Sequence, residues 1–243
     1  MDKFCEYYAN DSQKLLYSTI TEKRKRIVEK VRRAALQKYG GANEITAQNF
    51  KNVMTEDILK MMLEHVDREF FDNKLVETFE KNGCCLTLCF NNRCTSLAGR
   101  CSYWGKQLKL EMMNNVFIKS FKKTDLELRA VDNIPCKDIL TCYFLTFCHE
   151  LVHGIVFCNC LDFDKTDKGP GSWKGVTRPG NGHSKTFMSI LNNRFGHQKF
   201  THNLNTGITV ARLESPIFGS HNIKKGDIVI LEVRKRDKTR ENE

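Results

Sequence analysis

Apolar residues recur at helical spacing in two segments near the N-terminus. Over residues 12–38 they are Leu15, Leu16, Ile20, Ile27, Val31, Ala34 and Ala35, and over residues 55–71 they are Ile58, Leu59, Met62, Val66 and Phe70. A period of 3.6 residues is typical of amphipathic helices. The second segment also begins with Thr55, Glu56 and Asp57, a combination that favours a helix N-terminus. We therefore predict a helix over each segment.

The pattern changes to short strand-like runs between Cys84 and Met113. The runs cover residues 85–90, 97–103 and 108–112, and the turn-forming Asn91, Asn92 and Gly105 separate them. Short apolar runs divided by such residues are typical of hairpins. The sequence predicts a small antiparallel sheet in this region.

The second half of the chain contains a strongly apolar helical run over about residues 136–157, followed by residues 159–182, which have no periodicity. A further helix is predicted from Ser184, a suitable N-cap, with Phe187, Ile190, Leu191 and Phe195 on its apolar side. Two short strands, 207–213 and 227–233, come last. Helices combined with a small sheet indicate an α+β fold.

Charge and cysteine content indicate which partners and which cellular compartment to expect for this 243-residue chain. Lys and Arg number 39 against 29 Asp and Glu, a formal net charge of +10, which favours an anionic partner, although solubility alone would also explain it. We expect no membrane association, because no uncharged apolar run approaches the ~20 residues that cross a bilayer. With no signal-peptide pattern and an odd number of cysteines, 11, we expect an intracellular protein with reduced thiols, not a secreted one.

The apolar run over residues 138–157 contains the segment His149-Glu150-Leu151-Val152-His153. Histidines four residues apart lie on one face of a helix, so both imidazoles can bind one metal ion, with Glu150 beside them to accept a proton from water. Imidazole ligands suit zinc, and a catalytic zinc site uses three protein ligands. In the alternative interpretation, backbone or carboxylate partners satisfy the two histidines without a metal. The apolar flanks Phe147 and Val152 make a surface location for that alternative improbable.

A third ligand must come from elsewhere in the chain. Continuing the helical motif would require a histidine at position 159, which is Asn159. His183 stands at the start of a predicted helix, where an imidazole projects from a stiff element. His197 and His202 compete for this role, but they lie in predicted loops. We favour His183.

From about Val53 to Val210 the chain resembles the SprT-like metalloprotease domain, in particular the Spartan branch of DNA-dependent proteases. Four blocks in order carry the resemblance: residues 57–75, residues 98–110, His149 to Gly154, and Gly182 to Phe187. The resemblance implies a zincin-like core in which His149, His153 and His183 bind Zn²⁺ and Glu150 is the catalytic base. It also implies DNA as partner, single-stranded or at junctions, and nuclear localisation or wherever that DNA resides.

The resemblance divides the chain into a basic N-terminal helical extension (1–50), the metalloprotease domain (53–210) and a short β and basic tail (211–243). Residues 119–135 read as an insertion before the active-site helix. No CxxC pair occurs in the last eighty residues, where many family members carry a zinc ribbon.

Three functions remain open on this basis. The first is a zinc endopeptidase that cleaves DNA-associated or DNA-crosslinked proteins. The second is a non-proteolytic DNA-binding protein with a structural zinc site, and the third is a hydrolase of non-protein substrates. The presence of Glu150 favours an enzyme, because a structural site needs no base.

For DNA contacts we predict Trp173, Lys174, Arg178 and Lys185. An exposed indole beside cations is suited to stacking an unpaired base while binding its phosphates. In the alternative, Trp173 is a buried anchor, and DNA binds the basic helical segment 23–33 or the tail. The cysteines fit no zinc pattern, and we expect them to act as small buried hydrophobic residues.

Overall fold

The computed structural model describes residues 3–39, 43–94, 97–122, 127–160, 183–198 and 208–209. The predicted strand over 227–233 lies outside these residues. So do residues 161–182 and most of the predicted strand over 207–213.

The described helices are α1 (Lys3–Ala9), the short 3-10 helix η1 (Asp11–Gln13), α2 (Tyr17–Tyr39), α3 (Phe50–Val53), α4 (Glu56–Phe71), α5 (Leu75–Lys81), α6 (Asn114–Lys122), α7 (Ile139–Asn159) and α9 (Lys185–Phe195). The strands are β1 (Cys85–Phe90), β2 (Gly99–Trp104), β3 (Gln107–Met112), β4 (Glu127–Val131), β5 (Ile134–Cys136) and β6 (Ile208–Thr209). The fold is mixed α+β, as predicted. The long predicted helices are confirmed as α2, α4, α7 and α9, whereas α1, α5 and α6 are too short to show a clear period.

The prediction of an antiparallel sheet is wrong for the first sheet, whose strand order is β1-β3-β2. β2 and β3 pair antiparallel through a tight turn at Gly105 and Lys106, but β1 runs parallel to β3. The connection from β1 to β2 is long enough to carry the chain past the position that β3 then occupies. β3 is paired on both edges, and its Leu108, Leu110 and Met112 are buried. A second sheet has the order β5-β4-β6, with antiparallel pairs.

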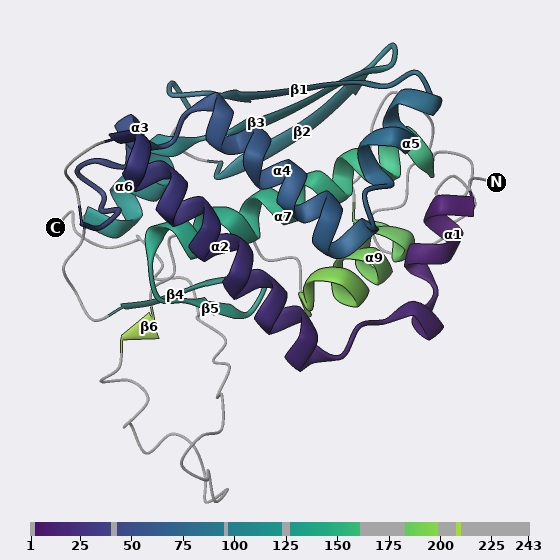
Figure 1. Cartoon of the computed structure of the whole chain (residues 1–243), viewed down its shortest axis with the longest axis horizontal. Helices are drawn as coiled ribbons and strands as arrows, with labels where there is room; N and C mark the ends of the chain where they lie inside the picture. The colour runs from purple at the N-terminus through teal and green to yellow at the C-terminus, as the bar shows by residue number, and fades with distance from the viewer. Residues whose placement is uncertain are drawn as a thin grey trace, which may run out of the picture.

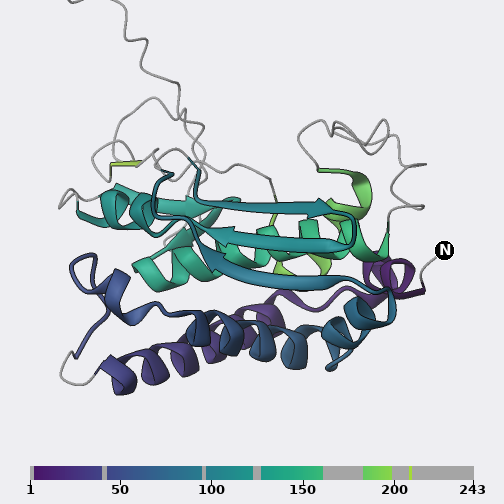
Figure 2. The same ribbon diagram turned by 90° about the horizontal axis from the view of Figure 1, so that it is seen from above.

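Helix α7 crosses the centre of the molecule beneath the first sheet, with α2 and α4 side by side on the outside (Figures 1 and 2). The residues of α7 are buried and largely apolar on every face of the helix, which is typical of a core helix. At Gly154 the helix approaches β3 so closely that a Cβ there would lie 2.8 Å from Cδ2 of Leu108. A larger residue at this position would therefore force the buried Leu108 side chain to move.

The helices of the predicted N-terminal extension contribute to the same hydrophobic core. In α1, Phe4 and Tyr8 are buried, and Tyr8 donates a hydrogen bond from its hydroxyl to the carbonyl of Phe71 at 3.0 Å. In α2, Ile20 and Val31 are also buried in this core. The packing joins residues 3–39 to the rest of the fold.

One pair of cysteines corrects the expectation of reduced thiols throughout. Cys5 of α1 and Cys160, just past α7, form a disulfide with Cα atoms 5.7 Å apart at a sequence separation of 155. Among the other cysteines, Cys84 and Cys148 are buried as predicted. The expectation of burial is wrong for Cys85, which is exposed, and for Cys89, Cys94, Cys101 and Cys158, which are half-buried. The pair arises because α1 packs against the end of α7, a contact that no spacing in the sequence reveals.

By length and composition alone, α7 is apolar enough to cross a membrane. However, 89% of its most apolar window is buried inside the protein. This burial is typical of the core helix of a folded domain.

Candidate metal centre

The middle of α7 carries the first part of the candidate site. The helix begins at the N-cap Asp138, whose carboxylate accepts a hydrogen bond from the Thr141 amide at 2.9 Å. Three turns further on, His149 and His153 lie on one face of the helix, with ring centroids 5.1 Å apart and the rings edge to face. Their exposed fractions are only 0% and 8%, so the two imidazoles are buried in the protein interior.

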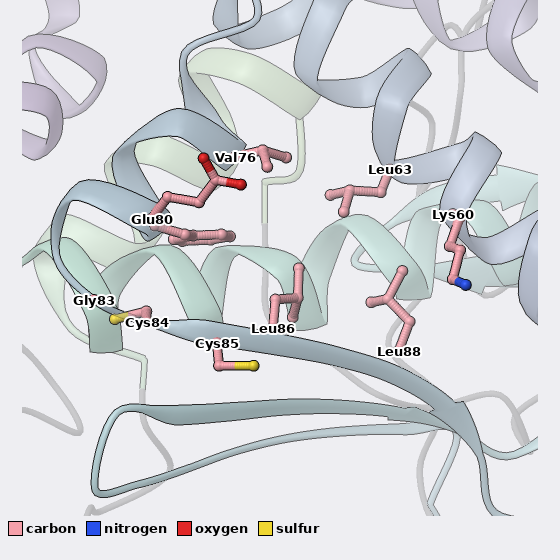
Figure 3. Close-up of a pocket in the computed structure, with 10 residues that line it drawn as sticks. Lys60, Leu63, Val76, Glu80, Gly83, Cys84, Cys85, Leu86 and Leu88 are labelled. Atoms are coloured by element: carbon pink, nitrogen blue, oxygen red, sulfur yellow. The ribbon is translucent and has the colours of Figure 1, made fainter.

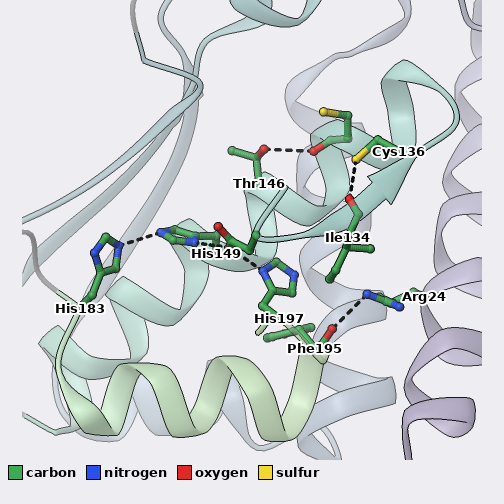
Figure 4. A network of polar contacts seen from close by, with 10 residues as sticks. Arg24, Ile134, Cys136, Thr146, His149, His183, Phe195 and His197 are labelled. Atoms are coloured by element: carbon green, nitrogen blue, oxygen red, sulfur yellow. Dashed lines mark hydrogen bonds and ion pairs between the residues drawn. The ribbon is translucent and has the colours of Figure 1, made fainter. Parts of the chain in front are cut away.

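His183, the third ligand predicted from the sequence, lies beside these two histidines. It precedes α9, whose N-cap Ser184 accepts a hydrogen bond from the Phe187 amide at 3.1 Å. The Nε2 atoms of His183 and His149 lie 3.1 Å apart (Figure 4). One nitrogen from each of the three imidazoles falls within 4.8 Å of the others.

This donor set fits a zinc ion. Two imidazole nitrogens on one tetrahedral zinc stand about 3.3 Å apart, given Zn–N bonds of ~2.0–2.1 Å. The separation of 3.1 Å between His149 and His183 is close to that value. Three buried imidazoles that converge on one point are the ligand type that zinc prefers. We conclude that this cluster could hold a metal ion.

The aromatic ring of Phe187 contacts all three imidazoles. Its ring centroid lies 4.3 Å from that of His153, 4.8 Å from that of His183 and 5.1 Å from that of His149. The side chain is fully buried. The sequence placed Phe187 on the apolar side of its helix but did not reveal this contact, because the contact joins α9 to α7.

Glu150 lies against strand β2 and is 3% exposed. The carboxylate accepts a hydrogen bond from the backbone N–H of Cys101. Burial raises the pKa of Glu150 to about 7, against the lowering effects of His149 and of the Cys101 amide. Gly99 leaves the room that this side chain needs, since a Cβ there would lie 2.5 Å from Cγ of Glu150.

Asp132 and His197 complete the cluster, and the sequence did not predict the role of either. One carboxylate oxygen of Asp132 accepts hydrogen bonds from His149 and His197, each at 2.7 Å. Burial alone would raise the pKa of Asp132, but the hydrogen bonds from the two imidazoles outweigh it and hold the pKa below its usual value. His197 had been considered only as a competing zinc ligand. The other competitor, His202, lies outside the described residues.

Three of the four residues predicted to contact DNA, Trp173, Lys174 and Arg178, lie outside the described residues. The fourth, Lys185, is exposed in the first turn of α9, two residues after His183. The prediction of a DNA contact at Lys185 therefore concerns a side chain on the surface near the histidine cluster.

The basic segment 23–33, the alternative DNA surface, uses most of its cations within the protein. Arg24 is buried and donates to the carbonyl of Phe195 at 3.2 Å (Figure 4). Contacts within or beside α2 engage five more of them: Lys23 with the Glu69 carbonyl, Lys25 with Glu22, Arg26 with Glu69, Arg32 with Glu29 and Asp138, and Arg33 with Glu29. These contacts favour the interpretation of the segment as a structural and solvated helix face.

Trp104, at the end of β2, is an exposed aromatic residue that the sequence analysis did not single out. Its side chain is 86% exposed. Lys106 follows in the turn to β3, and Lys109 lies on the same outer face of the sheet. A tight turn after an alternating strand was the signal that could have identified this residue.

A cavity of about 540 Å³ lies between α4, α5 and the edge strand β1 (Figure 3). Apolar side chains such as Leu63, Phe79 and Leu86 line it, with Lys60 and Glu80 also present. None of the residues of the histidine cluster contributes to it. We therefore assign it no part in the candidate metal centre.

Comparisons with protein-family models, with curated proteins and with solved structures found no match to this chain. The resemblance to SprT-like metalloproteases therefore rests on the residues quoted above.

Proposed function

We propose that this protein is a zinc-dependent endopeptidase of the SprT-like type that cleaves proteins associated with or crosslinked to DNA. One observation supports the proposal above all others. His149, His153 and His183 converge within 4.8 Å, and Glu150 follows the first of them in the same buried helix.

In this proposal the three imidazoles hold zinc, and Glu150 acts as general base. What zinc supplies in such a site is Lewis-acid polarisation of a carbonyl group and a lower pKa for water. Glu150 accepts the proton of the attacking water and returns it to the leaving amine. Burial favours the protonated form of this carboxyl group, whereas a bound zinc cation would favour the ionised form, and a balance of this kind suits a group that both accepts and returns a proton.

The surroundings of Glu150 favour an enzyme over a structural zinc site. Structural zinc sites are closed by four protein ligands, whereas the histidine cluster within the described residues offers three imidazoles. A carboxylate buried beside the cluster also costs solvation free energy that a structural site has no reason to spend. Gly99 and the Cys101 amide hold this carboxylate in one place, as a catalytic base requires.

The proposed DNA partner rests on charge, exposed groups and the family resemblance. The formal net charge is +10, and Lys185 lies on the surface near the cluster. Trp104, beside Lys106, offers an exposed indole on which an unpaired base could stack. We infer that single-stranded or junction DNA binds the protein and brings the attached protein substrate to the site.

Zinc analysis combined with a cleavage assay tests the proposal. The purified protein should carry about one zinc per chain and cleave casein or histone, with single-stranded DNA changing the rate. Glu150→Gln is nearly isosteric, so it should keep zinc and fold but lose at least ~100-fold in turnover.

Equal activity of the wild type and Glu150→Gln would refute the mechanism. Zinc and DNA binding without cleavage would instead support the non-proteolytic DNA-binding protein.

A further inference from the structure

Asp132 occupies the tip of the β4–β5 hairpin, within the segment that the sequence marked as an insertion. Val131 pairs with Ile134, which leaves Asp132 and Asn133 as a two-residue loop with φ of 49° and 68°. Two left-handed residues in such a loop are typical of a type I′ turn, in which Asp and Asn are favoured. The turn presents the Asp132 carboxylate to the protein interior, where it is 0% exposed.

The hydrogen bonds of Asp132 determine which nitrogen of each imidazole carries a proton. Both bonds run from Nδ1, of His149 and of His197, to the same oxygen, Oδ2, at 2.7 Å. An ionised carboxylate only accepts hydrogen bonds, so each Nδ1 is a donor. The lone pair of neutral His149 is then on Nε2, the atom that faces His183. This is the tautomer that a metal ligand needs.

His197 links the same carboxylate to the far end of α9. Gly196, with φ of 70°, caps the helix and turns the chain, so that the buried His197 points back towards Asp132. Arg24 donates to the carbonyl of Phe195, the last residue of the helix. The helix α9 is therefore attached near His149 at both ends, through His183 before its first residue and through His197 after its last (Figure 4).

A second metal ion bound by Asp132, His149 and His197 is the competing interpretation, since their ligand atoms also lie within 4.8 Å. The distances argue against it. Ligand atoms on one tetrahedral zinc stand about 3.3 Å apart. Separations of 2.7 Å between a carboxylate oxygen and an imidazole nitrogen are instead those of charge-assisted hydrogen bonds.

We propose that Asp132 and His197 are positioning residues of the metal centre: Asp132 orients His149 and sets its tautomer, and His197 holds Asp132 in place. The inference rests on the proposed zinc site. Partners of this kind on metal-binding histidines typically change metal affinity by ~10–100-fold.

Zinc affinity, measured by competition with a chelator, tests the roles of the two residues. Asp132→Asn should bind zinc ~10–100-fold more weakly than the wild type. His197→Leu removes the second donor and should weaken zinc binding in the same direction. His197→Asn keeps an N–H near the position of Nδ1 and should restore most of the affinity.

Asp67→Asn is the matched control. Asp67 is also a buried carboxylate with two donors, the amides of Leu75 at 2.8 Å and Val76 at 3.1 Å, but it caps α5 and has no part in the histidine cluster. This variant should melt at a lower temperature with and without zinc, while its zinc affinity and the rise in melting temperature on zinc binding stay unchanged. In Asp132→Asn that rise should shrink, because the stabilisation by a ligand grows with the logarithm of its affinity.

Wild-type zinc affinity in both Asp132→Asn and His197→Leu would overturn this inference and leave the proposed function standing. An equal loss of affinity in Asp67→Asn would overturn it too, since general destabilisation would then explain the effect. If Asp132→Asn does not fold, the comparison of His197→Leu with His197→Asn decides alone. A wild-type protein that binds no zinc would overturn the proposed function and the inference together.

Discussion

The substitution Gly99→Ala tests whether strand β2 fixes the position of Glu150. The added Cβ would lie 2.5 Å from Cγ and 3.0 Å from Cδ of Glu150. Carbon atoms in contact stand ~3.5–4.0 Å apart, so the carboxylate or the strand must move by about 1 Å. A misplacement of ~1 Å at a reacting group can cost ~100-fold in rate. We expect turnover to fall by about that factor, with zinc content unchanged because the three atoms nearest to the added Cβ all belong to Glu150 and none to a proposed ligand.

The assay compares initial rates of casein cleavage in the presence of single-stranded DNA, together with zinc content and melting temperature. Gly105→Ala is the control on the same hairpin. Its Cβ meets no atom within 4 Å, but a φ of +52° strains alanine, so stability should fall while the specific activity per folded protein stays the same.

The double variant Gly99→Ala/Glu150→Gln separates an effect on Glu150 from an effect on the sheet. If Gly99→Ala acts by displacing Glu150, it should cost nothing further once that carboxylate is gone. Full activity of Gly99→Ala, or the same loss in the Glu150→Gln background, would refute the reasoning.

Two further substitutions test the third ligand and the DNA contact. The zinc affinity of His183→Ala should fall by more than the ~10–100-fold expected for a residue that only hydrogen-bonds to a ligand. His65→Ala on α4 should keep the wild-type zinc affinity. Wild-type zinc affinity in His183→Ala would contradict the ligand assignment. Trp104→Ala should weaken single-stranded DNA binding by ~1–3 kcal/mol in a salt-sensitive titration and leave the melting temperature unchanged, since the side chain is 86% exposed. Loss of binding in Trp173→Ala but not in Trp104→Ala would instead support the contact predicted from the sequence.

The helices and the histidine pair were predictable because their signals are local. A 3.6-residue period identified α2 and α4, and a strongly apolar run identified α7. The geometry of a helix then placed His149 and His153 on one face. Ser184 marked the start of α9, and the structure places His183, the residue before it, beside the pair. These features depend on residues within a few positions of each other.

The sheet order and the second half of the site were not predictable in this way. Each strand of the first sheet was recognised, but the parallel pairing of β1 with β3 depends on the path of the chain between β1 and β2. Asp132 lies 17 residues before His149 and 65 before His197, within a hairpin that looked like an insertion. An Asp-Asn pair between the apolar Val131 and Ile134 was the available signal for that turn.

The sequence therefore establishes the local chemistry of this protein, namely two imidazoles and a carboxylate on one apolar helix, because helix geometry relates neighbouring residues directly. The packing of α9 and the β4–β5 hairpin against α7 determines which other residues join this helix in the candidate site. It brings His183 to within 3.1 Å of His149, joins Asp132 to two histidines and places Cys5 beside Cys160. Contacts between residues so far apart in the chain depend on how all the apolar faces are buried together, and no local pattern encodes that outcome.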